Sequence, residues 1–345
     1  MVQQLLEKIY QGHSLSREQS KQLFEQLIAG NMQDVTISAL LIALKLRGET
    51  IEEICGAADA LRDNAKHFPK SSVTAEQGIV DIVGTGGDGF NTINISTTAS
   101  FVAAAAGAKV AKHGNRSVSS QSGSSDLLAQ CGIGLTPTPE HASECLDQLG
   151  LCFLFAPHYH SGVKHAVPVR QALKTRTLFN ILGPLINPAR PDFMLLGVYD
   201  EALVLPIAQV LQGLGIKRAM VVHGSGLDEI ALHGHTSVAE LNHTEINCYQ
   251  LNPSDFGVAQ AEIEKLKGGT PADNAIISQA ILQGQSTAPQ RDAVAINAAA
   301  ALYLSGISPD LKSATQLALQ VLDSGKAYQL MQRLAQATQT EEAAS

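Results

Sequence analysis

The sequence has no tryptophan, few aromatic residues and no long apolar run. Aromatic residues make up 4% of its 345 residues, so the hydrophobic core has to be built from Ala, Leu, Ile and Val. No stretch reaches the roughly 18 consecutive apolar residues that a membrane helix needs, and the N-terminus lacks a basic start followed by an apolar segment. We therefore expect no membrane partner and a soluble, cytoplasmic protein.

The cysteines are few and are not paired in the sequence. None stands in a CxxC spacing, which argues against a structural zinc ion and against a redox dithiol. We expect reduced, mostly buried thiols. The five positions are Cys55, Cys131, Cys145, Cys152 and Cys248.

Acidic residues are missing from two long stretches, although the net charge is −8. That net charge argues against binding to nucleic acid, which depends on neutralising phosphates. Yet the 37 residues between Asp88 and Asp126, and the 44 between Asp147 and Asp192, contain no acid. This distribution favours a pocket kept clear for a small anion. The basic residues inside these stretches are Lys109, Lys112, Arg116, Lys164, Arg170, Lys174, Arg176 and Arg190.

The first 66 residues have the pattern of helices alone. Two capping boxes, Ser16 with Gln19 and Thr50 with Glu53, predict the starts of two of these helices. Helical spacing of apolar residues predicts two others, one around Leu5 and Ile9 and one over residues 35–46. Pro69 and the Ser/Thr run after it are typical of a linker.

From residue 79 onward, short apolar strands alternate with helical stretches. Such alternation implies parallel strands joined by crossover helices, so the fold class is α/β. We expect a small all-helical domain and a larger α/β domain with a mainly parallel central sheet. The expected strands cover residues 79–83, 109–112, 151–155, 195–199 and 219–223, with an antiparallel pair at 238–241 and 246–251.

Two polar segments follow the first strand. The run Gly84–Gly89 lets backbone N–H groups approach an anion, although a glycine turn after a strand can also be purely structural. Asn94–Thr97 opens a helix, where Ser96 is placed as the N-cap residue. A helix start also presents free N–H groups to a phosphate. Together the two segments predict a strand–loop–helix phosphate site.

A third polar segment, from Lys112 to Asp126, follows the second strand. It contains two cations, an amide and several hydroxyls, which suit a phosphate or pyrophosphate, and a solvated loop is the alternative. A fourth, His223–Glu229, ends in two adjacent carboxylates. Adjacent side chains on a straight strand point to opposite faces, so both acids can serve one site only if they stand in a turn or bind separate ions. Oxygen ligands of this kind suit Mg²⁺. A surface pair is the alternative.

Arg170 lies in a basic segment that also contains His158, His160 and His165. An arginine fork suits a bidentate carboxylate, although a lone structural arginine is the common alternative. The histidines have no carboxylate or cysteine nearby, so zinc is not expected there.

Four strings carry a resemblance to a known family: GTGGDGFNTINIST, KHGNRSVSSQSGSSD, GVKHAVPVRQALKTRTLFNILGPLINPA and HGSGLDE. Over essentially its whole length the sequence resembles the anthranilate phosphoribosyltransferases. The resemblance implies a nucleoside phosphorylase/phosphoribosyltransferase-like fold and a homodimer formed through the helical domain. It implies a small domain of residues 1–70 completed by a returning segment at about 162–190, and a large domain of residues 71–161 and 191–340.

The same resemblance implies transfer of the phosphoribosyl group of phosphoribosyl pyrophosphate to the amine of anthranilate, in tryptophan biosynthesis. Magnesium, as two ions, would be held by Ser96, Asp228 and Glu229. Anthranilate would contact Gly84, Asn115 and Arg170, and His113 would position the amine. No covalent residue is expected. Phosphoribosyl pyrophosphate would be held by Gly84, Gly87, Asp88, Thr92, Asn94, Ile95, Ser96, Thr97, Lys112, His113, Gly114, Asn115, Arg116, Ser117, Val118, Ser119, Ser120 and Ser124.

Two other functions are compatible with the expected architecture. One is a pyrimidine nucleoside phosphorylase, whose phosphate-loop pattern differs from KHGNRS. The other is a non-catalytic relative that binds nucleic acid, against which the negative net charge argues.

Overall fold

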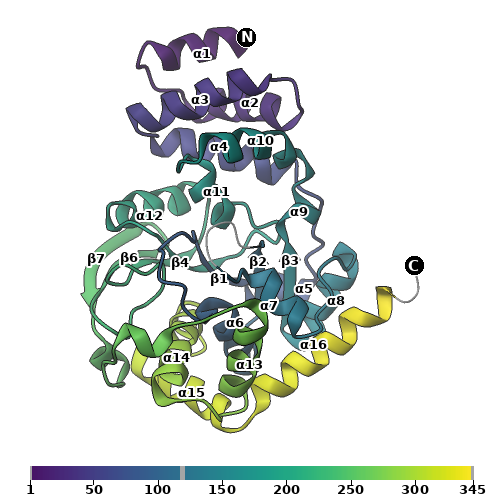
Figure 1. Ribbon diagram of the computed structural model, residues 1–345, viewed down its shortest axis with the longest axis vertical. Coiled ribbons are helices and arrows are strands. Elements are labelled where there is room, and N and C mark those ends of the chain that lie inside the picture. The colour runs from purple at the N-terminus through teal and green to yellow at the C-terminus, as the bar shows by residue number, and fades with distance from the viewer. Residues whose placement is uncertain (1, 117–120, 343–345) are drawn as a thin grey trace.

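The computed structural model describes residues 2–116 and 121–342 as a stack of helices seated on a mixed sheet that is itself flanked by helices (Figure 1). Within these ranges no helix is both long enough and apolar enough to cross a membrane. The α/β class and the helical N-terminal part expected from the sequence are both confirmed.

The central sheet has seven strands in the order β3-β2-β1-β4-β5-β6-β7. The first five in this order pair in parallel, and the last two are added antiparallel. The parallel strands end at one common edge, where ligands bind in open α/β sheets. The strands are β1 (Val80–Gly84), β2 (Val110–Gly114), β3 (Leu151–Phe155), β4 (Phe193–Gly197), β5 (Arg218–His223), β6 (Thr236–Asn242) and β7 (Glu245–Leu251).

The N-terminal helices form the stack at the top of Figure 1. Both predicted capping boxes are present, because Ser16 and Thr50 each accept from the amide three residues on, and the Gln19 and Glu53 side chains reach back. A short returning segment packs on α2 and α3. The elements of the stack are α1 (Val2–Tyr10), α2 (Arg17–Ile28), α3 (Asp34–Arg47), α4 (Ile51–Asp63), η1 (Ser161–Ala166) and α10 (Val167–Leu173).

The core of this stack continues into one face of the sheet. One apolar cluster runs from Leu23 in α2 to Leu211 in α12 and Val221 in β5. The exact domain boundaries expected from the sequence, near residues 70, 161 and 190, therefore stay a prediction. Other helices and turns around the sheet are α5 (Ser72–Gln77), α7 (Ser124–Gln130), α8 (Pro139–Leu149), α9 (Ala156–Tyr159), α11 (Phe179–Leu185), α12 (Val204–Gly213), η2 (Glu201–Leu203), η3 (Pro253–Phe256) and η4 (Ile263–Leu266).

The other face of the sheet is covered by alanine-rich helices. Residues 293–302 of α14 are almost completely buried, and α14 packs directly on α6. Small side chains allow this close approach in a protein with few aromatic residues. The helices of this layer are α6 (Ile95–Ala105), α13 (Pro271–Leu282), α14 (Ala288–Leu304), α15 (Leu311–Asp323) and α16 (Lys326–Glu342).

One expectation for this region was wrong. The Ser/Thr run after Pro69 is not a plain linker, because Ser72–Gln77 forms α5. The Ser71 hydroxyl caps that helix by accepting from the Thr74 amide, and it donates to Asp147 of α8 at 2.6 Å. A contact with a residue so distant in sequence could not be anticipated from the local pattern.

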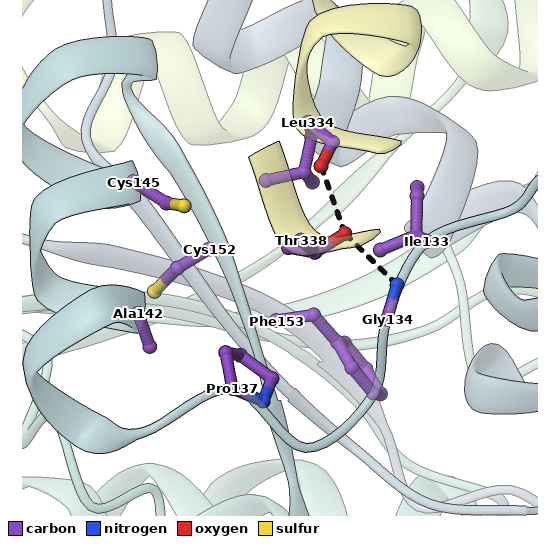
Figure 2. A pocket seen from close by; sticks show the side chains of 9 residues that line it. All are labelled: Ile133, Gly134, Pro137, Ala142, Cys145, Cys152, Phe153, Leu334 and Thr338. Carbon is purple, nitrogen blue, oxygen red and sulfur yellow. Dashed lines mark hydrogen bonds between the residues drawn. The ribbon is translucent and has the colours of Figure 1, made fainter. Parts of the chain in front are cut away.

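The C-terminal helix α16 is fixed by a hydrogen bond near its end (Figure 2). The Thr338 hydroxyl accepts from the Gly134 amide at 2.9 Å and donates to the Leu334 carbonyl at 2.9 Å. The space between α16, α8 and β3 is only about 10 Å³, which is too small for a ligand. Cys145 and Cys152 line it as reduced thiols, and Cys55 is likewise reduced and buried.

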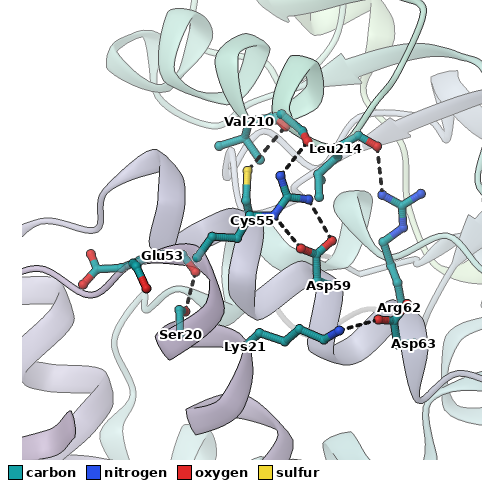
Figure 3. A network of polar contacts seen from close by, with 12 residues as sticks. Ser20, Lys21, Glu53, Cys55, Asp59, Arg62, Asp63, Val210 and Leu214 are labelled. Atoms are coloured by element: carbon teal, nitrogen blue, oxygen red, sulfur yellow. Dashed lines mark hydrogen bonds and ion pairs between the residues drawn. The ribbon is translucent and has the colours of Figure 1, made fainter.

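The helical stack is also anchored on the C-terminal end of α12 (Figure 3). This helix has no basic residue in its last turn, so the carbonyls there need other partners. Arg17 donates to the Gly213 carbonyl at 2.8 Å and Arg62 to the Leu214 carbonyl at 3.4 Å. Arg17 is itself oriented by a bidentate pair with Asp59, at 2.6 and 3.1 Å.

Arg17→Met is therefore expected to lower the free energy of unfolding by about 1–2 kcal/mol, because it removes one charged donor and a bidentate pair. Urea unfolding would measure the change. The control is Lys21→Met, which breaks the more exposed pair with Asp63 and should cost no more than about 0.5 kcal/mol. Equal losses in the two variants would contradict an anchoring role for Arg17.

Candidate active site

A cavity of about 120 Å³ opens at the carboxyl edge of the parallel strands. Five segments meet there: the glycine loop after β1, the start of α6, the loop after β2, the loop after β5, and the residue Gly269 before α13. This is the edge at which the sequence predicted a site. The residues that line the cavity are Gly86, Gly87, Asp88, Asn91, Thr92, Ile93, Asn94, Ile95, Ser96, Thr97, Gln121, Ser122, Asp228, Glu229 and Gly269.

The two adjacent carboxylates both face this site. A tight turn brings them there, with Gly224 and Leu227 exchanging backbone hydrogen bonds and Ser225 and Gly226 at positive φ. Asp228 is buried, so the alternative of a surface acid pair is wrong. Burial raises the pKa of Asp228 well above its usual range, and burial raises the pKa of Glu229 to about 7.

Each carboxylate accepts hydrogen bonds from a different neighbouring segment. Asp228 accepts from the Gly86 amide at 2.6 Å. Both oxygens of Glu229 lie 2.7 Å from the Ser96 hydroxyl, and one accepts from the Ser96 amide at 3.2 Å. The hydroxyl and the two acids thus form one cluster of oxygen atoms at the start of α6.

The close packing of Asp228 against the ends of β1 and β4 explains why Gly84 and Gly197 are glycines. A Cβ added at Gly84 would lie 2.2 Å from the Asp228 carboxylate, and one added at Gly197 would lie 1.7 Å from its carbonyl oxygen. Neither distance is possible for a real side chain, so Asp228 needs glycine at the ends of both β1 and β4. Gly84 therefore has a packing role, whatever it contacts in a ligand.

The start of α6 differs from the expectation in one respect. The helix begins at Ile95 with Asn94 as the N-cap residue, so the prediction that Ser96 is the N-cap is wrong. The Ser96 hydroxyl is taken by Glu229 instead. Asn94 links three segments, because it donates to the Ser122 carbonyl at 3.2 Å and accepts from Ser122 and Asn274 at 3.1 and 2.8 Å.

Lys112 of β2 is buried behind the cavity rather than in its wall. Its ammonium donates to the Ile82 carbonyl at 2.6 Å, and burial lowers its pKa. Asp81 of β1 lies close by, and burial raises the pKa of that carboxyl to about 6. Asn187 donates to Asp81 and to the Ala111 carbonyl, both at 2.8 Å. The sequence reading missed Asp81 and Asn187, because a single polar residue beside apolar ones carries no distinctive signal.

His113 and His160 form a buried pair of neutral rings. Their centroids are 5.2 Å apart in an edge-to-face arrangement, and His113 lies 3.2 Å from the Gly183 carbonyl. Burial lowers the pKa of His113 to about 3 and that of His160 to about 4. Arg170 of α10 lies over the Phe179 ring at 5.4 Å, and burial lowers its pKa too.

The loop after β2 is described only in part. Asn115 accepts from the Ser124 hydroxyl at 3.2 Å, and Arg116 lies 3.8 Å from Asp126. Ser117, Val118, Ser119 and Ser120 lie outside the described residues. Among the described residues, several expected ligand contacts do not line the cavity: Gly84, Lys112, His113, Gly114, Asn115, Arg116, Ser124 and Arg170.

Six residues that line the cavity were not anticipated, and one of them is the apolar residue Ile93. Gly86 lies in the glycine run Gly84–Gly89, and Gln121 and Ser122 lie in the third polar segment, Lys112–Asp126. The sequence motifs therefore indicated the segments but not these individual residues. Asn91 and Gly269 come together through the hydrogen bond from the Gly268 amide to the Asn91 carbonyl at 2.9 Å. Only the folded chain brings those two together.

Comparison with known proteins identifies the family. The model for the a/b domain of a glycosyl transferase family matches residues 76–328, and the model for the helical bundle domain of a glycosyl transferase family matches residues 3–65. The anthranilate phosphoribosyltransferase of Shewanella denitrificans is 66% identical over 339 residues, which cover 98% of this chain and 94% of that protein. That of Shewanella sp. strain ANA-3 is 68% identical, covering 97% and 96%. The chain belongs to the anthranilate phosphoribosyltransferase family.

Solved structures of anthranilate phosphoribosyltransferases have the same fold. The enzyme from Thermus thermophilus superposes with a TM-score of 0.92 at 41% identity, covering 97% of this chain and 99% of that one. The enzyme from Saccharomyces cerevisiae in complex with PRPP and Mg superposes with a TM-score of 0.89 at 27% identity, covering 98% of each chain.

In this anthranilate phosphoribosyltransferase family member, Gly84→Ala should lower the free energy of unfolding by about 1–3 kcal/mol through overpacking against Asp228. Urea unfolding would measure it. Gly183→Ala is the matched control, because its added Cβ meets nothing within 4 Å and it stands in a helix. The Gly183→Ala variant should have an unchanged or slightly higher free energy of unfolding. A stable Gly84→Ala variant would show that Asp228 does not lie against β1.

Proposed function

We propose that this chain transfers the phosphoribosyl group of phosphoribosyl pyrophosphate to the amine of anthranilate. The products are N-(5-phosphoribosyl)anthranilate and pyrophosphate, in tryptophan biosynthesis. The observation that carries this proposal is the pair Asp228 and Glu229, which faces Ser96 and the glycine loop across one cavity. The relatives described above carry neither alternative name, nucleoside phosphorylase or nucleic-acid-binding protein.

The diphosphate would bind over the glycine loop and the start of α6. Glycines at positive φ, Gly86, Gly87 and Gly89, let consecutive N–H groups converge on an anion. The first turn of α6 adds its unpaired amides and the positive end of the helix dipole. This placement supports the assignment of Gly87, Asp88, Thr92 and Asn94–Thr97 to phosphoribosyl pyrophosphate. The assignment of Gly84, residues 112–120 and Ser124 to the same substrate is proposed from the family resemblance.

Magnesium fits the oxygen atoms of Ser96, Asp228 and Glu229. Two carboxyls whose pKa values are raised by desolvation are costly as isolated anions, and a divalent cation would compensate them. Among the described residues no group of three or more His, Cys, Asp or Glu side chains is placed to hold a metal ion by itself. A Mg²⁺ ion here would therefore also need the Ser96 hydroxyl and substrate oxygens as ligands. When bound, the ion neutralises the charge that develops on the departing pyrophosphate. The use of two ions is part of this proposal.

Anthranilate would be held by its carboxylate at Arg170, with Gly84 and Asn115 also in contact. The half-buried Arg170 guanidinium gains most from a bidentate carboxylate because burial already disfavours its unpaired charge. His113 is neutral and can accept a hydrogen bond from the amine, which supports its positioning role.

In the proposed reaction the anthranilate nitrogen forms a bond to ribose C1 as the bond from C1 to the pyrophosphate oxygen breaks, and the nitrogen loses one proton. The amine needs no covalent intermediate, because alignment of the two substrates supplies much of the acceleration. Backbone N–H groups at the loop and at α6 stabilise the departing charge.

The test follows anthranilate fluorescence in the presence of purified protein, phosphoribosyl pyrophosphate and Mg²⁺. Signal loss that requires all three is the expected result. Omitting either the metal or the phosphoribosyl donor provides the controls. A flat trace from folded protein would overturn the proposed function and leave the fold intact.

Arg170→Ala is expected to raise the KM for anthranilate by roughly 10- to 100-fold, because a charged bidentate contact is worth that much. The KM for phosphoribosyl pyrophosphate should change little. Steady-state kinetics with each substrate varied in turn would measure both. Equal increases would remove the carboxylate role of Arg170.

We also propose a homodimer formed through the helical stack. Val35, Ala39, Ile42 and Leu46 are apolar residues at helical spacing on one outward side of α3, and Val35 and Leu46 are 71% and 81% exposed. Such a stripe favours burial against a second copy. The domain boundaries, a cytoplasmic location and the lack of nucleic-acid binding stay predictions.

Leu46→Glu is expected to shift the dimer toward monomer, since it places a charge in the apolar stripe. Sedimentation velocity over a range of protein concentrations would detect the shift. Ile276→Glu is the control, because Ile276 is 69% exposed on α13, at the other end of the molecule (Figure 1). A stable dimer from Leu46→Glu, or the same shift in both variants, would contradict this interface.

A further inference from the structure

The segment between α10 and α11 connects the helical stack to the glycine loop. The chain leaves α10 at Lys174, which has a positive φ of 48°. Lys45 of α3 donates to the next residue, Thr175. Arg176 then donates from its guanidinium to the Gly87 carbonyl. One short segment thus touches α3 on one side and the loop that lines the cavity on the other.

The Arg176 side chain is held on a flat aromatic support. Its guanidinium carbon lies 3.9 Å from the centre of the Tyr199 ring, in stacking contact. Tyr199 follows β4, and its amide donates to the Thr85 hydroxyl at 3.1 Å. The Thr85 amide in turn donates to the Gly197 carbonyl at 3.0 Å. The glycine loop and the arginine are therefore fixed to the same strand end.

The hydrogen bond to Gly87 determines how the loop presents its amides. Gly86 and Gly87 have φ of 71° and 82°. Because glycine has no Cβ, the peptide units beside these two residues can rotate more easily than those beside other residues. In a trans peptide the carbonyl and the following N–H point in opposite directions. When Arg176 holds the Gly87 carbonyl, it also fixes the direction of the Asp88 N–H. Asp228 fixes the Gly86 amide in the same way, at 2.6 Å.

We propose that Arg176 is a positioning residue that holds the glycine loop in the orientation needed by the diphosphate of the phosphoribosyl donor. The proposal rests on the proposed function and deepens it. Arg176 lies six residues beyond Arg170, so a single segment carries the contact proposed for the acceptor and the contact that orders the donor loop. The arginine acts through Gly87 and is not assigned a contact with either substrate.

The first experiment compares steady-state kinetics of Arg176→Met, Arg176→Lys and the wild type. Arg176→Met should raise the KM for phosphoribosyl pyrophosphate about tenfold, because a charged donor to a carbonyl is lost. The KM for anthranilate should change much less. Arg176→Lys keeps the charge but lacks the planar fork that stacks on Tyr199, so it should recover only a small part of the loss. Arg333→Met, an exposed change on α16, is the matched control and should have no effect.

Arg176→Lys could restore the wild-type KM fully, and the KM increase of Arg176→Met could disappear at high salt. Both results together would mean that the arginine only attracts an anionic substrate. That outcome would overturn the positioning role. A further variant, Tyr199→Leu, removes the aromatic support and should shift the same KM in the same direction. The double variant with Arg176→Met should then be less than additive, as expected for two residues acting through one contact. Additive effects would contradict the coupling.

A second readout does not depend on activity. In the ligand-free protein, Arg176→Met should speed amide hydrogen exchange in the peptide that covers residues 85–90, and Arg333→Met should leave it unchanged. Unchanged loop exchange together with an unchanged KM would overturn the inference even if the wild type transfers the phosphoribosyl group. If the wild type has no transferase activity, the proposed function fails, and the exchange experiment still decides whether Arg176 orders the loop.

Discussion

The burial of ionisable groups at one edge of the parallel sheet is the constraint on which the site depends. Asp228 and Glu229 lie at that edge, with Lys112 and Asp81 behind them in β2 and β1. Burial raises the pKa of all three acids and lowers that of the lysine. Charges in such a place are costly unless hydrogen bonds compensate them. The compensating donors come from separate segments: Asn187, the Gly86 amide and the Ser96 hydroxyl. The acids therefore determine which parts of the chain have to meet.

The glycines of the motifs follow from the same constraint. Asp228 lies so close to the ends of β1 and β4 that Gly84 and Gly197 cannot carry a side chain. Gly224 has the same restriction, since a Cβ there would lie 2.3 Å from the Glu229 carbonyl oxygen. Glycine loops of this kind are often explained by the ligand that they bind. Here the packing of the chain around the two acids is already sufficient reason for Gly84 and Gly224 in the motifs, and for Gly197 at the end of β4, before any ligand is considered.

The sequence predicted the parts of the fold that depend on local pattern. The capping boxes at Ser16 and Thr50, the five parallel strands and the turn that carries both acids are local features, and they were confirmed. The N-cap role of Ser96 was wrong because its hydroxyl pairs with Glu229, 133 residues away. Asp81 and Asn187 were missed for a similar reason, since their pairing spans 106 residues. Local patterns locate the loops of the candidate site, but the partners of individual polar atoms depend on the tertiary fold.

Two of the polar contacts that join the helical stack to the rest of the described chain differ in character. At the end of α12, two arginines and a thiol donate to backbone carbonyls, and the Asp59 pair holds one of the arginines in place. At the glycine loop the connection is the hydrogen bond from Arg176, just beyond α10, to Gly87. The first contact has several donors, so losing one leaves the others, whereas among the described residues Arg176 is the one donor to the Gly87 carbonyl. A small change in the position of α10 would therefore leave the α12 anchor nearly unchanged while it altered the loop. On the proposed assignment, the acceptor site on α10 and the donor loop are then adjusted together, because the same short segment carries both.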